Sequence, residues 1–298
     1  MASFNGEKYI ADQIKSILRQ TLVSVDLVIH DDNSTDKTVG ILQEIVESEK
    51  NVTLITHDIS SGSAGQNFFR AILTCSLGDY DFVAFADQDD IWAESKLAIA
   101  VTKISHTHSD GYSCSTEAFW PNGSRRLLHQ CPERLLVDFL FEGGGQGCTF
   151  VLTYKLFLKA RKFMGDHPDS YSNFYYHDWY LYLLMSVWKR GWVFDSEPLL
   201  QYRQHSINDT GARWGFSALI SRFQLIKSGW YKSQVLQASY IAIQAGSDDE
   251  KVHAVQKYVG QKNCLSDRIR FSGIALRYGR RKLSDRLVLL FSIFIGWL

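Results

Sequence analysis

The chain has 298 residues, which is enough for one large α/β domain with an appended segment. Its 32 Lys and Arg residues balance its 32 Asp and Glu residues, so no basic field indicates nucleic-acid binding. Its five cysteines form no Cys-x-x-Cys pair, which argues against structural zinc and is typical of reduced thiols in a cytosolic protein.

The first hundred residues alternate between helical and strand patterns. Helical spacing of apolar residues predicts helices at 7–20, 37–48, 66–77 and 92–104. β-Prone runs predict strands at 25–29, 52–56 and 82–86. This β-α-β alternation predicts a largely parallel sheet covered by helices.

Two of these strands end in clustered carboxylates. The carboxylates are Asp31 and Asp32 after the strand at 25–29, and Asp87, Asp89 and Asp90 after the strand at 82–86. Negative charge at the end of a buried strand is costly unless a cation lies nearby. Ligands bind at the carboxyl ends of strands in open α/β sheets, and oxygen ligands suit Mg²⁺ or Mn²⁺. A solvated turn with a helix cap is the alternative, but the pattern favours a nucleotide-and-metal site.

The second half of the chain is less regular and is strongly aromatic between 174 and 188. His177-Asp178-Trp179 opens a predicted helix there, where Asp178 is either a complement to the helix dipole or a functional carboxylate. The glycine run at 143–147 is not followed by the Lys-Ser/Thr pair of a Walker phosphate loop. This run either forms a wall where the backbone approaches a sugar or only allows the chain to turn.

The C-terminal tail from 216 onward has helical periodicity. A basic cluster at 277–282 precedes the 12 residues 287–298, which carry no charge. A helix that spans a bilayer needs about 20 residues, so this segment is too short. The pattern predicts an interfacial helix on an anionic membrane leaflet, with a terminal helix docked on the protein's own core as the alternative.

Six motifs occur in a fixed order between residue 1 and about residue 211. They are Ala2-Ser3-Phe4-Asn5-Gly6-Glu7-Lys8-Tyr9, Asp31-Asp32-Asn33-Ser34-Thr35-Asp36, Asp87-Gln88-Asp89-Asp90-Ile91-Trp92, Gly147-Cys148-Thr149, His177-Asp178-Trp179 and Tyr202-Arg203-Gln204-His205. Each motif is weak alone, but the ordered set is specific. It resembles the family 2 glycosyltransferases of the GT-A fold, nearest to the bacterial rhamnosyltransferase-like branch.

The resemblance implies an α/β, Rossmann-like GT-A fold with a mostly parallel central sheet flanked by helices. It divides residues 1–212 into a nucleotide-binding half, 1–105, and an acceptor half, 106–212, and makes 213–298 a helical, membrane-associating extension. One feature departs from the family, whose members open with a longer apolar strand, whereas Met1 stands almost on the first turn. We therefore expect that the central strand is missing or that the native chain starts upstream, which would leave this chain unstable or inactive.

The resemblance also implies an inverting transfer of a sugar from a nucleotide diphosphate donor. In that reaction Asp87 and Asp89 hold Mg²⁺ or Mn²⁺, and Asp178 is the catalytic base. The expected nucleotide-sugar contacts are Ser3, Asp31, Asp32, Arg70, Asp87 and Lys96. The expected contacts to the acceptor or the diphosphate are His177, Trp179, Arg203 and His205.

The motifs favour dTDP-L-rhamnose as the donor and a lipid-linked or cell-surface glycan as the acceptor. Such an enzyme would work in the cytoplasm, on the inner face of a bacterial membrane, without a nucleic-acid partner. A UDP-hexose donor is the alternative within this class. A nucleotidyltransferase would carry a Gly-rich basic loop near its N-terminus, which Ser3-Phe4-Asn5-Gly6 is not. A non-catalytic glycan-binding or scaffold protein would bind sugar without metal or nucleotide.

Overall fold

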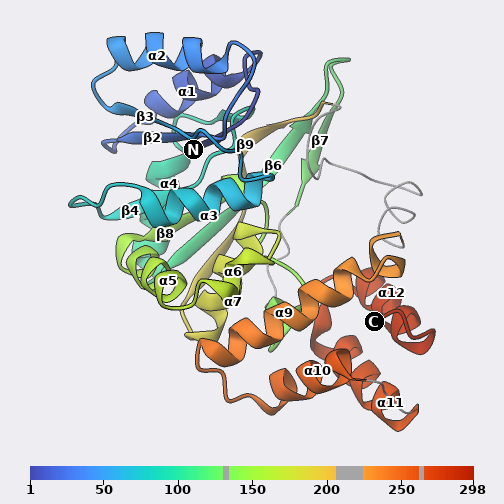
Figure 1. Ribbon diagram of the computed structural model, residues 1–298. Helices are drawn as coiled ribbons and strands as arrows, with labels where there is room; N and C mark the ends of the chain where they lie inside the picture. The colour runs from blue at the N-terminus through green and yellow to red at the C-terminus, as the bar shows by residue number, and fades with distance from the viewer. Residues whose placement is uncertain (130–133, 206–223, 262–264) are drawn as a thin grey trace.

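The N-terminal part of the chain forms a three-stranded parallel sheet in the order β1-β2-β3 (Figure 1). In this computed structural model the described residues are 1–129, 134–205, 224–261 and 265–298. The strands are β1 (Ala2–Ser3), β2 (Leu27–Asp31) and β3 (Val52–Thr56), and the helices are α1 (Ile10–Leu18), α2 (Thr38–Ser48) and α3 (Ala64–Thr74). The apolar faces that periodicity predicted lie inward, with Ile10, Ile14 and Ile17 of α1 packed on the sheet.

The short strand β1 lies at the position of the longer N-terminal strand that family members have. β1 has two residues and pairs with β2 in the register Ala2 to His30. On its other side the Ala2 amide donates to the carbonyl of Ala86, 3.2 Å away. The Met1 ammonium group donates to the Val28 carbonyl at 2.7 Å. Two residues of the expected strand are therefore present, and they join the first sheet to the strand that carries the acidic turn, while the upstream start stays a prediction.

The second sheet has six strands in the order β4-β8-β6-β9-β5, with β7 paired to β6. The strands are β4 (Phe82–Ala84), β5 (Ile91–Trp92), β6 (Gly111–Phe119), β7 (Arg125–Leu128), β8 (Val151–Thr153) and β9 (Trp192–Arg203). The β6–β9 pair is parallel, and the other pairs of this sheet are antiparallel. The α/β class and the parallel first sheet are confirmed. The second sheet is mixed, because β8 pairs antiparallel with both β4 and β6 while β6 and β9 run parallel.

Helices cover this sheet and carry the motifs of the second half. They are α4 (Lys96–Thr107), α5 (Tyr154–Asp166), α6 (Asp169–Ser172) and α7 (His177–Val187), with 3₁₀ turns η1 (Asp138–Leu140) and η2 (Gly147–Thr149). Helix α7 is apolar on nearly all sides, and its residues from Trp179 to Met185 are buried. A helix with this composition belongs inside a protein, where it fixes the position of whatever its first turn carries.

The C-terminal helices pack together beside α7, which α9 contacts (Figure 1). They are α9 (Trp230–Gln244), α10 (Glu250–Gly260), α11 (Leu265–Ile274), the π-helical turn η3 (Ala275–Gly279) and α12 (Leu283–Phe294). The helical tail is thus confirmed from 224 onward, whereas 216–223, Cys131 and Cys264 lie outside the described residues. Within the described ranges, no helix is both long and apolar enough to cross a membrane.

Buried ion pairs hold the C-terminal helices to the segment that begins with η1. Arg281 Nη1 lies 3.0 Å from Asp138 Oδ2, and both side chains are buried. The neighbouring Arg280 bridges Glu142 at 3.3 Å and Asp285, on α12, at 3.2 Å. Charges removed from water in this way persist only when they are paired, so these contacts fix the position of α12.

Candidate active site

A cavity of about 1190 Å³ lies where β1, β2 and the strand before Asp87 end. One wall comes from the N-terminal loops, including Ser3 to Tyr9, Asp32 and part of 60–67. The floor comes from the acidic turn, the glycine run and the start of α7. The third wall comes from the C-terminal helices, through Leu225, Ile226, Trp230, Tyr231, Arg280, Asp285, Val288 and Leu289. This third wall was not predicted, because nothing local in a helical tail indicates which cavity it borders.

The two carboxylates after β2 have different surroundings. Asp31 is fully buried and accepts hydrogen bonds from Ser3 Oγ at 2.8 Å and from Ser34 Oγ at 2.7 Å. Asp32 lines the cavity and accepts from Ser60 Oγ and the Ser61 amide, both at 2.8 Å. Asp32 and Ser3 therefore lie where a ligand could contact them, whereas Asp31 shapes the loop beneath.

The two expected basic contacts lie outside the cavity lining. Arg70 Nη1 is 3.3 Å from Asp32 Oδ1 and 2.9 Å from the Ile59 carbonyl, so this side chain braces Asp32. Lys96 is fully buried, with its ammonium nitrogen 3.4 Å from the centroid of the Trp92 ring. Burial lowers the pKa of Lys96 to about 8. Its position does not fit a direct contact to a donor.

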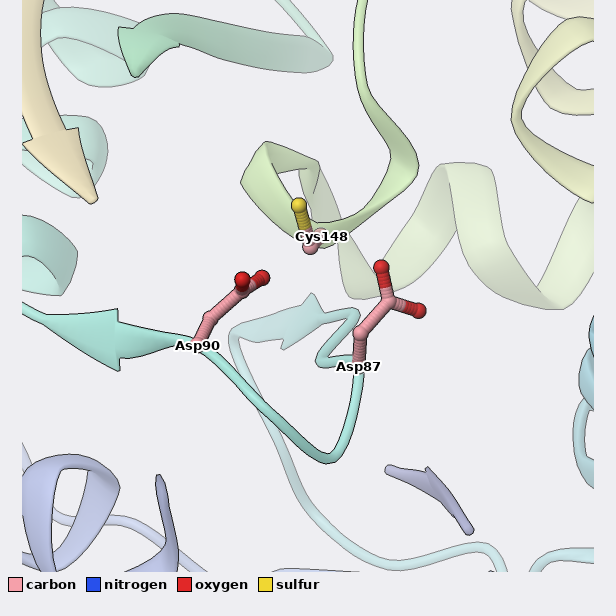
Figure 2. Close-up of side chains that lie close together, drawn as sticks. All are labelled: Asp87, Asp90 and Cys148. Carbon is pink, nitrogen blue, oxygen red and sulfur yellow. The ribbon is translucent and has the colours of Figure 1, made fainter. Parts of the chain in front are cut away.

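Asp87, Asp90 and Cys148 form the most compact group of candidate metal ligands in the described ranges. One ligand atom of each lies within 4.8 Å of the others, and Figure 2 shows the two carboxylates on one turn beside the segment that carries Cys148. Asp90 is fully buried, and its Oδ2 has no hydrogen-bond partner among the described residues. The sequence analysis placed Asp90 in the acidic cluster but named only Asp87 and Asp89 as metal ligands, and it gave Cys148 no role in the site, although Cys148 stands in one of the motifs.

The electrostatics of this turn fit a divalent cation. Burial, followed by the charges of Asp89 and Asp178, raises the pKa of Asp87 to about 7. Burial and the Asp89 charge hold the pKa of Asp90 well above its usual range, and burial does the same for the Cys148 thiol. Adjacent carboxylates that resist ionisation and offer an unpartnered oxygen are stabilised when a cation neutralises them. The residues present therefore suit Mg²⁺ or Mn²⁺.

Asp89 is joined to the end of β9. His205 Nε2 lies 2.6 Å from Asp89 Oδ2, and the His205 ring stacks on Tyr9 with centroids 5.3 Å apart. Arg203 Nε donates to the Asp89 backbone carbonyl at 2.9 Å. The Arg203 guanidinium also lies over the rings of Tyr9 and Phe119, at 4.5 and 4.8 Å. Asp89 and His205 line the cavity, whereas Arg203 supports the turn from behind.

The His-Asp-Trp motif begins α7 and borders the cavity. Asp178 Oδ2 accepts from the Gly147 amide at 3.1 Å, and its Oδ1 accepts from the Trp179 amide at 2.6 Å. His177 stacks on Phe68 at 3.8 Å, and burial lowers its pKa to about 3, so its ring is neutral. Trp179 is mostly core, with Nε1 donating to the Phe139 carbonyl at 2.7 Å.

The glycine run lies against α7. A Cβ added at Gly147 would lie 2.6 Å from His177 Nε2, and one added at Gly143 would lie 3.2 Å from the Trp179 Cα. Glycine is required here because the backbone packs directly on the first turn of that helix. The His177 Nε2 atom has no hydrogen-bond partner within the described part of the chain. This atom is itself buried, so it does not open onto the cavity.

Comparisons with known proteins identify the family of this chain. A family model described as glycosyl transferase family 2 matches residues 1–174. The dTDP-rhamnosyl transferase RfbG of Shigella flexneri is 34% identical over 236 residues, covering 79% of this chain and 82% of the relative. The glucosyltransferase WfgD of Escherichia coli, named for UDP-Glc and a diphosphoundecaprenol-linked GlcNAc, is 28% identical over 57% of this chain and 65% of its own length.

Solved structures share the fold. TarS of S. aureus, residues 1–349 in complex with UDP, superposes with a TM-score of 0.57 and 17% identity, covering 100% of this chain and 79% of that one. A mannosyltransferase from Pyrobaculum calidifontis, in complex with GDP-Man and Mn²⁺, has a TM-score of 0.50 and 16% identity, covering 100% and 79%. The family resemblance seen in the ordered motifs is confirmed: this chain belongs to glycosyltransferase family 2 and is a glycosyltransferase.

Proposed function

We propose that this enzyme is an inverting, metal-dependent transferase that moves L-rhamnose from dTDP-L-rhamnose to a lipid-linked or cell-surface glycan. One observation carries the proposal: the acidic turn and Asp178 meet in one cavity, closely enough for the Asp178 charge to raise the pKa of Asp87. The RfbG relative supports rhamnose, since its name is dTDP-rhamnosyl transferase. A UDP-hexose donor is the second candidate, favoured by the name of WfgD and by the UDP bound in the TarS structure.

In the proposed reaction a single displacement inverts the anomeric carbon, so one base is sufficient. Asp178 takes the proton from the acceptor hydroxyl as it attacks, and the Gly147 amide holds one of its oxygens in place. His177 borders the acceptor side of the cavity as a neutral ring, and Ser3 and Asp32 contact the nucleoside. Asp87 and Asp89 would hold a divalent cation, which would supply positive charge to the leaving diphosphate.

Thermal unfolding with a nucleotide panel tests the donor. We expect dTDP with Mn²⁺ to raise the melting temperature more than UDP, with GDP as the unmatched control. A ligand that binds only the folded chain adds about 2.7 kcal/mol of stability at a hundred times its Kd. A larger shift with UDP would replace rhamnose by a hexose donor. No shift with any nucleotide, in a chain that unfolds cooperatively, would contradict the proposal.

The division at residue 212 and the membrane location are part of the same proposal. Residues 1–212 would supply donor site and base, and 213–298 would approach the inner face of a bacterial membrane. Helix α12 buries Leu289 and Ile293 but leaves four apolar side chains 50–62% exposed, and Lys282 and Arg277 are exposed nearby. The four are Leu283, Leu287, Phe291 and Phe294. Such a face with flanking cations suits an anionic lipid surface.

Vesicle sedimentation tests this location. We expect wild-type protein to pellet with vesicles rich in phosphatidylglycerol and not with phosphatidylcholine alone. Replacing Leu287 and Phe291 with Glu should lower the vesicle partition coefficient about tenfold or more, because two apolar side chains that would be buried in the lipid are lost. Leu22→Glu, at an exposed position far from α12 in the chain, is the matched control. Equal binding by all three proteins would show that α12 does not contact lipid.

A further inference from the structure

Three aromatic rings line the cavity beside Asp178 and have no part in the proposed chemistry. Tyr175 and Tyr176 immediately precede α7, and Trp230 is the first residue of α9. The ring centroids are 4.7 Å apart for the two tyrosines, and 5.7 and 5.9 Å from each tyrosine to Trp230. All three side chains are half-buried, so each exposes part of its ring.

This aromatic cluster is held from both sides. The Tyr175 amide donates to Gln234 Oε1 at 2.9 Å, and Gln234 Nε2 donates to the Asn173 carbonyl at 3.1 Å. Gln234 is buried and lies one helical turn after Trp230. On the opposite side, a Cβ at Gly65 would overlap the Tyr175 carbonyl oxygen, so α3 packs directly on this backbone. The rings are therefore positioned before any ligand binds.

We propose that Tyr175, Tyr176 and Trp230 form a subsite for the pyranose ring of the acceptor. An aromatic ring presents a negative face, which attracts the C–H groups on the apolar side of a sugar, and half-buried rings offer that contact at little entropic cost. Pockets of this kind fix a ligand through aromatic walls and a few polar groups. The inference rests on the proposed function, because it assigns the acceptor of that reaction.

Two observations favour the acceptor over the donor as the source of this sugar. Asp178, the proposed base, must touch the hydroxyl that attacks, and it follows Tyr176 by two positions on the same segment. The cavity wall next to Trp230 continues through Leu225 and Ile226, which are apolar and unsuited to a diphosphate. The diphosphate of the donor belongs instead at the acidic turn, where the proposed cation would bind it.

Saturation-transfer NMR tests the subsite directly, because it reports which sugar protons touch the protein. The probes are methyl α-L-rhamnopyranoside and methyl N-acetyl-β-D-glucosaminide, each added to the full chain with dTDP and Mg²⁺, which is diamagnetic and leaves the sugar signals sharp. We expect the ring C–H protons of at least one probe to be saturated by wild type. Trp230→Ala should weaken binding about tenfold, and Trp230→Phe should retain most of it. Tyr240→Ala, on the exposed side of α9, is the control.

The nucleotide-induced melting shift is measured in the same samples. If Trp230→Ala lowers that shift as well, the rings serve the donor and the inference is overturned. It is also overturned if wild type saturates neither probe, or if Trp230→Ala binds like Tyr240→Ala. A Trp230-dependent sugar contact without any nucleotide shift would support the subsite and refute the proposed function. If Trp230→Ala does not fold, Tyr176→Leu provides the same comparison.

Discussion

Replacing Asp178 with Asn should lower kcat for sugar transfer by about 10²–10⁴-fold, which is the usual contribution of a positioned base. The amide oxygen of Asn can still accept the hydrogen bond from the Gly147 amide, but its NH₂ group cannot accept the second one, from the Trp179 amide, so the melting temperature of the variant is the check on its folding. What the variant loses is the ability to take a proton from the acceptor hydroxyl. Steady-state kinetics with donor and acceptor varied separately would measure this loss.

The matched control for this experiment is Asp169→Asn, which removes an exposed carboxylate from the nearby helix α6. It should leave kcat unchanged. In Asp178→Asn the nucleotide-induced melting shift should be retained, because Asp178 is not a proposed contact of the metal or the nucleotide, and removing its charge lowers the pKa of Asp87 and favours the ionised form of that ligand. An Asp178→Asn enzyme with wild-type kcat would mean that another group takes the proton.

Asp89→Ala should abolish the dependence of nucleotide binding on Mn²⁺. Removing this carboxylate takes one negative charge from the acidic turn and leaves His205 without the carboxylate 2.6 Å from its Nε2. A cation and a diphosphate that bind together are then held by fewer oxygens, so the Mn²⁺-dependent melting shift disappears. Thermal unfolding with dTDP, with and without Mn²⁺, measures the effect.

Two further variants sharpen the result. Asp89→Asn can still accept a hydrogen bond from His205 but lacks the charge, so it should fail like Asp89→Ala if the charge is what binds the cation. Asp79→Ala removes an exposed carboxylate from the turn before β4 and should behave like wild type. A full Mn²⁺-dependent shift in Asp89→Ala would assign the cation to other ligands, with Asp87, Asp90 and Cys148 the first to examine.

Local patterns predicted the parts of the site that follow directly from strands. A strand of alternating or continuous apolar residues has a definite end, and the carboxylates at the ends of β2 and β4 were expected at one edge of the sheet. Asp32, Asp87 and Asp89 do line one cavity. The same reasoning could not separate Asp31 from Asp32, because adjacent residues on a chain point in different directions and only tertiary contacts decide which one is buried.

The remaining features depend on contacts between distant segments. Cys148 reaches the acidic turn because β8 pairs with β4, and His205 reaches Asp89 because β9 pairs with β5. Lysine side chains are usually exposed on the surface, yet Lys96 is buried with its ammonium group over the Trp92 ring. Long-range pairing of this kind leaves no signal in the local sequence, which also explains why the mixed sheet and the third wall of the cavity were not predicted.

The buried pair between Arg281 and Asp138 has a consequence for substrate selection. A wall held in place by paired charges that are shielded from water does not have to be ordered when a substrate binds. Little binding energy is then lost to induced fit, and discrimination among acceptors is decided by how well each shape matches a surface that already exists. With a preformed wall of this kind, a change of acceptor during evolution would require new side chains on α9 and α12 rather than new motions.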